Sequence, residues 1–329
     1  MIKDNALLKV SIILFRMILL ILGLALLTFT LAHYSPIDPV QAYLGAETHA
    51  TPEQVAQVEE QWGLNKPMSE QFFHWILSLI KGDFGMSRLY KAPVLDVVSE
   101  AFKNSLILMM TSWVLSGIVG YVLGTVAAFR AGKMADKIIK WYCYTLASIP
   151  SNVIGLIFLV VFGVILKIFP IGLSSPIGIL SQDVTFAQRL HHFVLPCVTL
   201  SFLGIANVAM HTREEMLKVL DSEYILFAKA RGESTWELFS HHCIRNTIIP
   251  VLMLQFSYFS ELFGGSALAE IVFAYHGLGS VMTTAGLKGD LPLLLGTIVF
   301  SSLFVFFGNF IADIFAKIVD PRIKEAAYE

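Results

Sequence analysis

Six long apolar segments constrain the fold of this chain more than any other feature. The first is the run 10–32, and about 20 apolar residues suffice to cross a bilayer as a helix. Backbone polar groups in hydrocarbon must be hydrogen-bonded within the protein, which favours helices over open strands. The sequence therefore predicts an all-α integral membrane protein with six transmembrane helices. The other five segments are 105–129, 141–166, 193–210, 247–272 and 291–312.

The composition supports this class. The chain is 56% hydrophobic and only 15% charged, whereas soluble domains carry about a quarter charged residues. The net charge of -2 is uninformative, because membrane orientation depends on where Lys and Arg lie. Cys143, Cys197 and Cys243 lack the spacing of a metal site, so we expect free thiols.

The first apolar run could also be a secretory signal peptide. The apolar core of such a peptide is about 7–15 residues long, which is shorter than the run 10–32. We therefore expect a retained first span whose amino terminus lies in the cytoplasm.

The distribution of basic residues predicts the orientation. Six spans place both termini on the same side of the membrane. Of the 23 Lys and Arg residues, 15 lie in the amino terminus, the loop 130–140, the polar segment 213–250 and the carboxyl tail. Because cytoplasmic loops carry an excess of Lys and Arg, we expect both termini and the polar segment to be cytoplasmic.

A helical extracytoplasmic region is expected after the first span. Thr51, Pro52 and Gln54 form a typical helix start, with Thr as the cap and Pro at the first helical position. A second helix over 69–81, apolar along one side, would lie on the membrane surface or pack on the spans. Gly63 and Gly82 are expected to end these helices. The predicted parts are the amino terminus and first span (1–34), the extracytoplasmic region (35–102), the core domain (103–319) and the cytoplasmic tail (320–329).

Residues 213–250, hereafter the connector, form the longest polar segment in the second half of the chain. Its eleven charged side chains cannot lie in hydrocarbon. Its pattern is a helix, Gly232, a short helix, and Pro250 where the next apolar run begins. Glycine adopts the left-handed conformation that ends many helices. We therefore expect a bent helical connector that presents a docking surface.

The connector resembles the cytoplasmic loop of ABC-importer permeases of the dipeptide, oligopeptide and nickel branch. The resemblance extends to the first outer region (62–67 and 82–87), the fourth-span entry (192–196), the fifth-span exit (270–279) and the ending (320–322). Two departures are His276, where the branch usually has Pro, and the additional acid Glu261. The matching connector residues are Glu223, Tyr224, Ile225, Ala228, Ala230, Gly232, Arg245, Asn246, Ile248, Ile249 and Pro250.

The resemblance implies a multi-pass permease subunit in a bacterial or archaeal inner membrane, with a coupling helix between spans 4 and 5. Its implied partners are a second homologous permease, two cytosolic ATPases and an extracytoplasmic solute-binding protein, with no nucleic acid. ATP and Mg²⁺ would bind to the ATPases. This chain would bind no cofactor and is therefore not expected to be an enzyme. Consistently, the sequence contains no G-x-x-x-x-G-K-[ST] phosphate-binding loop.

The short helix of the connector, at about 234–242, is expected to insert into a cleft on an ATPase. Trp236 and Phe239 lie three residues apart and would supply apolar anchors on one side. Glu233, Glu237 and Arg245 would form the polar rim, and a solvated loop with two buried aromatic residues is the alternative. The predicted coupling residues are Glu223, Tyr224, Ala228, Ala230, Gly232, Trp236, Phe239, Arg245, Asn246 and Pro250.

Glu261 and Glu270 are candidates for the translocation path, because an ionisable residue inside a span usually faces a cavity or a partner. Glu261 would lie near mid-span and meet a cationic group of the cargo, or bond a partner helix. Glu270 lies near the outer end and is expected to form a structural pair. An alternative function is a secondary transporter driven by an ion gradient through Glu261, although no inverted repeat with broken helices is evident.

The cargo remains open between short peptides and a small, possibly nickel-containing, chelate. The adjacent pairs His191–His192 and His241–His242 are poor metal ligands, because neighbours on a helix point about 100° apart. We therefore expect no metal site.

Overall fold

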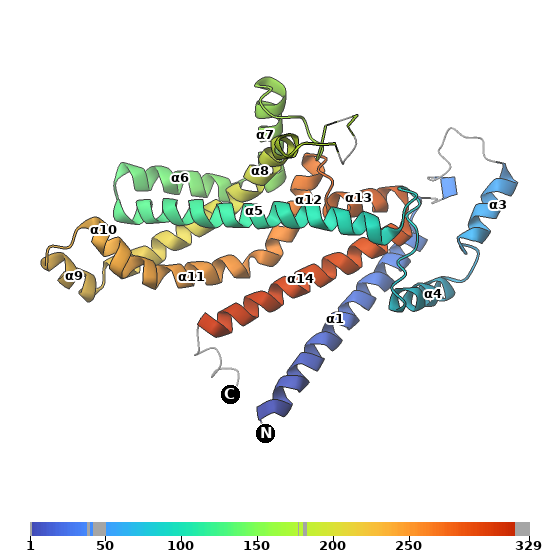
Figure 1. Cartoon of the computed structure of the whole chain (residues 1–329), viewed down its shortest axis with the longest axis horizontal. Helices are drawn as coiled ribbons and strands as arrows, with labels where there is room; N and C mark the ends of the chain where they lie inside the picture. The colour runs from blue at the N-terminus through green and yellow to red at the C-terminus, as the bar shows by residue number, and fades with distance from the viewer. Residues whose placement is uncertain (1, 38–39, 42–50, 177, 180–182, 320–329) are drawn as a thin grey trace. The chain divides into compact units, whose positions relative to one another are not determined.

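The computed structural model of the protein describes residues 2–37, 40–41, 51–176, 178–179 and 183–319, and every regular element in these ranges is helical (Figure 1). The chain divides into two compact units, one of residues 1–105 with 276–306, the other of 106–275 with 307–329. The long helices α5 (Val94–Phe129) and α14 (Leu291–Val319) contribute to both units.

Three helical stretches among the described residues are long and apolar enough to cross a membrane: Phe15–His33, Val94–Phe129 and Leu291–Ala312. Three further pairs of helices qualify if each bent pair is one span. The prediction of an all-α membrane protein is confirmed at this level.

In the first unit, the helices predicted after the first span are present. α3 (Pro52–Gln61) begins with the predicted cap, because Thr51 Oγ1 accepts from the Gln54 N–H and Gln54 Oε1 accepts from the Thr51 N–H. α4 (Met68–Ile80) follows, and Gly63 and Gly82 adopt φ of 65° and 80° just after the two helices. These local predictions are confirmed.

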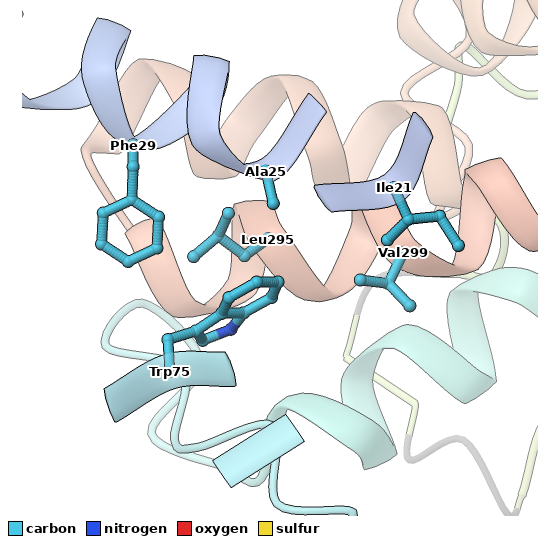
Figure 2. Close-up of a cluster of buried hydrophobic side chains, with 6 residues drawn as sticks. All are labelled: Ile21, Ala25, Phe29, Trp75, Leu295 and Val299. Atoms are coloured by element: carbon cyan, nitrogen blue, oxygen red, sulfur yellow. The ribbon is translucent and has the colours of Figure 1, made fainter. Parts of the chain in front are cut away.

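The core of this unit joins α1 (Ile2–His33), α4 and α14. Trp75 of α4 is buried, and its ring centroid lies 6.1 Å from that of Phe29 on α1. α4 therefore packs on a span, the second of the two placements expected for it. The six buried side chains in Figure 2 are Ile21, Ala25, Phe29, Trp75, Leu295 and Val299.

The second unit is organised around α8 (Phe186–Leu220), which contacts α6 (Met134–Ser148), α7 (Ser151–Phe158) and α11 (Ile244–Ser257). One buried cluster joins α6, α7 and α8 through Cys143, Leu146, Ile154, Ala206 and Ala209. All three cysteines of the chain are buried and free, as predicted.

The apolar run 141–166, predicted as one span, is not one straight helix. α6 ends at Ser148, and the chain resumes as α7 and the π-helix η1 (Leu159–Ile165), with a bend of 106°. The cause is Pro150, which lacks an N–H and disfavours helical geometry at the residue before it. Accordingly, Ile149 is extended, with φ of -107° and ψ of 127°.

The run 247–272 is also not one straight helix. α11 ends at Ser257, and α12 (Phe259–Val272) continues after a 60° bend. Ser257 Oγ donates to the Met253 carbonyl at 2.9 Å, a bond that often bends helices. Pro250, predicted at the start of this run, instead lies inside α11. The remaining element, α13 (Leu278–Lys288), belongs to the first unit.

Candidate functional site

The connector folds as a chain of short helices within the second unit. The end of α8 leads into α9 (Glu223–Ala230), the turn at Gly232, α10 (Thr235–Glu237) and the π-helix η2 (Leu238–Cys243). α11 follows η2 directly.

Gly232 terminates α9 as predicted. It adopts φ of 88°, its N–H donates to the Lys229 carbonyl at 3.0 Å, and the Glu233 N–H donates to the Ala228 carbonyl at 3.2 Å. These two bonds are the pair that defines a Schellman motif. The motif satisfies two carbonyls at the end of α9 and reverses the chain toward α10.

Replacing Gly232 with alanine is expected to destabilise the protein by about 1–2 kcal/mol, the cost of a left-handed side-chain-bearing residue. No heavy atom lies within 4 Å of the added Cβ, so the whole effect comes from the backbone. Gly286 of α13 is the matched control, since its added Cβ also meets nothing within 4 Å but no positive φ is present. Gly286→Ala should be neutral or stabilising by up to about 1 kcal/mol. Equal melting temperatures of the two variants would contradict this account.

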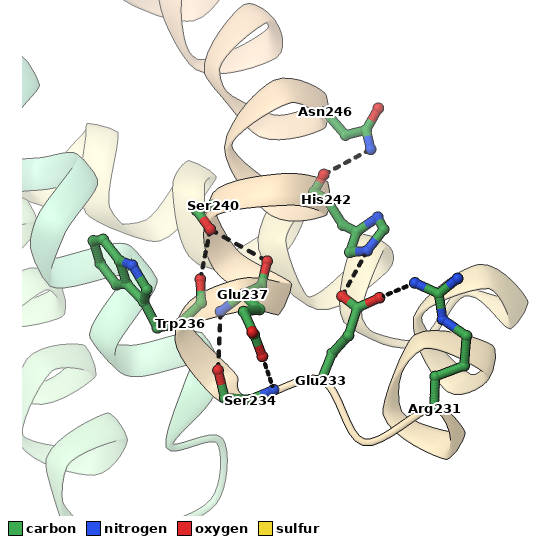
Figure 3. A network of polar contacts seen from close by, with 8 residues as sticks. All are labelled: Arg231, Glu233, Ser234, Trp236, Glu237, Ser240, His242 and Asn246. Atoms are coloured by element: carbon green, nitrogen blue, oxygen red, sulfur yellow. Dashed lines mark hydrogen bonds and ion pairs between the residues drawn. The ribbon is translucent and has the colours of Figure 1, made fainter.

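Ser234 caps the next helix. Its Oγ accepts from the Glu237 N–H at 3.3 Å, while Glu237 Oε2 accepts from the Ser234 N–H at 2.6 Å (Figure 3). Sequence reasoning missed this capping box, although the spacing Ser-x-x-Glu is its usual signal. Glu237, predicted in a polar rim, therefore also fixes the helix start.

The expectation of a separate short helix over 234–242 needs correction. α10 passes into η2 and then α11 without a non-helical residue between Thr235 and Ser257. A π-helical stretch inside an α-helix accommodates an extra residue per turn. The part of the connector after Gly232 is thus continuous with α11.

Glu233 links α9 to η2, which lie before and after the turn at Gly232. It is paired with Arg231, and its Oε2 lies 3.0 Å from Nε2 of His242 (Figure 3). The hydrogen bond from Arg231 is the main cause of a lowered pKa of Glu233, and His242 acts in the same direction. Asn246 Nδ2 donates to the His242 carbonyl at 2.8 Å and to Tyr224 Oη at 3.3 Å. These contacts hold α9 against η2 and α11.

One face of the connector is buried. Ile225 and Ala228 of α9 pack with Leu238 and Cys243 of η2 in one cluster, which Ala128 of α5 and Met216 of α8 complete. Ile225 and Ala228 lie three residues apart and therefore on the same side of α9. The connector is therefore a folded part of the unit.

Other large apolar side chains of the connector are exposed. Trp236 is 72% exposed, Leu226 70% and Phe227 65%. Phe239, predicted as a second anchor beside Trp236, is half-buried, with its ring centroid 6.2 Å from that of Phe129 and 5.6 Å from that of Trp236. The Phe239 ring thus packs against both Phe129 and Trp236. The predicted residues Glu223, Ala230 and Arg245 are exposed, and Pro250 is half-buried.

An ion pair that sequence reasoning missed lies at the base of the connector. Arg213 of α8 donates through Nε and Nη2 to the two carboxylate oxygens of Asp136, at 2.7 and 2.9 Å. Asp136 is fully buried and also accepts from the Gly132 N–H at 2.9 Å. The two partners are 77 residues apart in sequence, and no local pattern links them. The pair fixes α8 to the first turn of α6, and the bond from Gly132 joins the α5–α6 loop to the same carboxylate.

The candidate path residues differ in environment. Glu261 is exposed in the first turn of α12, and Glu270 is fully buried near the end of the same helix. Glu261 was expected near the middle of one continuous span, but the bend after Ser257 separates it from α11.

The histidine pairs do not form a metal site in the part of the chain that the structure describes, where no group of three His, Cys, Asp or Glu side chains could hold an ion. His191 Nε2 contacts the Ile168 carbonyl at 2.7 Å, and His192 Nδ1 contacts the Gly172 carbonyl at 3.1 Å. Each ring is thus directed to backbone oxygens.

The apolar helices and the folded polar connector together define a helical membrane protein of the multi-pass class. Comparison with known proteins gives the family. The sequence pattern of binding-protein-dependent transport system inner membrane components matches residues 120–325, and the pattern of the amino-terminal part of such components matches residues 7–113. The chain belongs to this family of transport permeases.

Three relatives illustrate the similarity. An oligopeptide transport system permease protein of Bacillus subtilis is 31% identical, over 93% of this chain and 95% of its own. A probable peptide ABC transporter permease of Sinorhizobium fredii is 32% identical, over 90% and 92%. A glutathione transport system permease protein of Escherichia coli is 30% identical, over 91% and 93%. The family confirms the resemblance predicted from sequence, and it does not support the alternative of a gradient-driven secondary transporter.

Proposed function

We propose that this permease subunit imports short peptides, and that it forms half of a translocation path with a second permease. Two cytosolic ATPases would supply the energy, and an extracytoplasmic binding protein would deliver the cargo. The relatives compared above are named for oligopeptides, peptides and glutathione, which favours short peptides over a nickel chelate.

The observation that carries the coupling role is that the connector combines a buried cluster with exposed apolar side chains. Ile225, Ala228, Leu238 and Cys243 pack against α5 and α8. Trp236, Leu226 and Phe227 are exposed and available to a partner. Exposed aromatic side chains surrounded by polar groups are typical energetic centres of protein interfaces. Glu223, Arg245 and the Glu233 network would form the polar rim around them.

Coupling would be mechanical. Closure of the two ATPases on ATP would displace the bound connector, and the continuous helix from Thr235 to Ser257 would transmit the movement to the membrane. The buried Asp136–Arg213 pair would make α6 move together with α8. The path would then alternate between outward and inward access by rigid-body rearrangement.

The proposed topology has six spans with both termini in the cytoplasm. The bias of Lys and Arg supports this orientation. Three spans would be the long helices, and three would be the bent pairs centred on Pro150, on the middle of α8 and on Tyr258. Residues 35–102 would be extracytoplasmic.

Glu261 is the proposed cavity carboxylate, because its exposure leaves it available to cargo, whereas the buried Glu270 would act structurally. Glu261→Gln is expected to raise the KM for peptides with a free amino group about five- to tenfold, or about 1–1.4 kcal/mol. The KM for the same peptides after N-acetylation should be unchanged. Equal effects on both peptide forms would exclude a contact with the amine.

The function is tested by reconstitution in liposomes. Chain purified alone should take up no radiolabelled tripeptide, with or without an ion gradient. Assembly with the ATPases, the second permease and the binding protein should give ATP-dependent uptake. Uptake by the isolated chain would contradict the proposal.

A further inference from the structure

The first unit contains a cavity of about 620 Å³ that is lined in part by a half-buried arginine, one donor atom of which is buried and unused. Arg88 lines this cavity and an adjoining one of about 430 Å³. Its guanidinium carbon lies 3.9 Å from the centroid of the Trp62 ring. Its Nη1 is inaccessible to water and has no hydrogen-bond partner among the residues that the structure describes. A buried charged donor without an acceptor is costly, which indicates that an anion completes the site.

Asp290 does not serve as that anion. Asp290 acts on Arg88 electrostatically, but its carboxylate already accepts from Ser87 Oγ at 2.7 Å and from the N–H groups of Leu89 and Leu293 at 2.9 and 3.2 Å. Burial outweighs Asp290 and lowers the pKa of Arg88 to about 10. Arg88 therefore remains charged at neutral pH and under-solvated.

A second ionisable group faces the same cavity. Glu59 of α3 lines it and is half-buried, and its carboxylate forms no ion pair with any residue in the described ranges. A cavity wall with one cation and one anion complements a zwitterion, whose negative group would bind Arg88 and whose amine would bind Glu59.

The position of the cavity indicates which kind of zwitterionic ligand it would bind. Its walls include Leu31 and His33 at the end of one candidate span, and Leu291, Leu294 and Ile298 at the start of another. In the proposed topology both spans end at these residues, which would place the cavity at the depth of lipid headgroups. The apolar wall formed by Leu31, Leu294 and Ile298 runs along the spans, where an acyl chain would lie. Trp62, beside Arg88, is of the type enriched at that boundary.

We propose that this cavity binds a phospholipid with a zwitterionic, amine-bearing headgroup, whose phosphate contacts Arg88 and whose ammonium group contacts Glu59. The bound lipid would fasten α1, α3 and α14 together within this unit. The inference is independent of the proposed cargo and of coupling to ATPases.

The test uses the full chain, purified in detergent and stripped of lipid, with native mass spectrometry as the readout. Wild type should retain dioleoyl-phosphatidylethanolamine at about tenfold lower concentration than dioleoyl-phosphatidylglycerol. Arg88→Gln should weaken retention of both lipids about tenfold or more. Glu59→Gln should remove the preference for the ethanolamine lipid while retaining binding. Lys81→Gln, at an exposed basic position in the same unit, is the matched control and should behave as wild type.

A melting experiment distinguishes lipid binding from a purely structural role of Arg88. Because a ligand stabilises the state that binds it, phosphatidylethanolamine should raise the melting temperature of wild type and Lys81→Gln, but not of Arg88→Gln. In detergent alone, Arg88→Gln should have the same melting temperature as wild type. Three results would overturn the proposal: equal lipid retention by Arg88→Gln, a lower melting temperature of that variant in detergent alone, or displacement of the lipid by trialanine, which would indicate a peptide site.

Discussion

Trp236→Ala is expected to lower ATP-driven uptake by the assembled transporter at least 30-fold, with a parallel loss of the co-purifying ATPase. Trp236 is 72% exposed, so its removal leaves the fold of the subunit largely intact. Central interface tryptophans typically contribute about 2–4 kcal/mol to binding, which corresponds to a factor of roughly 30 to 1000. The measurements are peptide uptake in proteoliposomes and the amount of ATPase bound to the purified complex.

The chain offers a matched control for this prediction. Trp141 on α6 is 71% exposed in the same unit but lies outside the connector, so Trp141→Ala should retain uptake and ATPase within about twofold. Phe239 cannot serve this purpose, because it packs on Phe129 within the subunit. Full ATPase binding by Trp236→Ala would remove this residue from the interface.

Asp136→Asn is expected to destabilise the protein by about 3–5 kcal/mol, the usual cost of removing one partner of a buried ion pair. Asp136 is fully buried, and the Arg213 side chain is only 16% exposed, so the substitution leaves the guanidinium charge without its bidentate acceptor. The amide oxygen of Asn could still accept from the Gly132 N–H, so the loss comes mainly from Arg213. The measurement is the free energy of unfolding in a denaturant series.

Glu215→Gln is the control for this effect. It breaks an ion pair between Glu215 and Lys218 whose lysine side chain is 69% exposed, and exposed pairs contribute less than about 1 kcal/mol. The double variant Asp136→Asn with Arg213→Gln should recover part of the stability, because it removes the uncompensated charge. A loss below about 1 kcal/mol for Asp136→Asn would show that the pair is dispensable.

The features that the sequence predicted are those set by local chemistry. The cap at Thr51, the left-handed turn at Gly232 and the end of α4 at Gly82 depend on a few adjacent residues. The apolar segments predicted the helical membrane class for the same reason, since their lengths alone match the bilayer.

The features that it did not predict depend on tertiary contacts. The pairing of Asp136 with Arg213 brings together residues far apart in sequence. Helical spacing placed Trp236 and Phe239 on one side, but only packing against α5 decides that Phe239 is half-buried. The effect of each proline on helix continuity was also not predictable from sequence, because Pro150 separates two helices whereas Pro250 lies within one.

The central claim is that a cytosolic ATPase binds the connector beside Trp236. Its most direct test places a benzophenone-maleimide probe on Thr235→Cys, since Thr235 is exposed next to Trp236 and the three native cysteines are buried. Irradiation of the assembled, ATP-hydrolysing transporter should cross-link the ATPase to this position, and the same probe on Lys81→Cys should not reach it. A transporter that takes up peptide normally, yet forms no cross-link from position 235, would contradict the account.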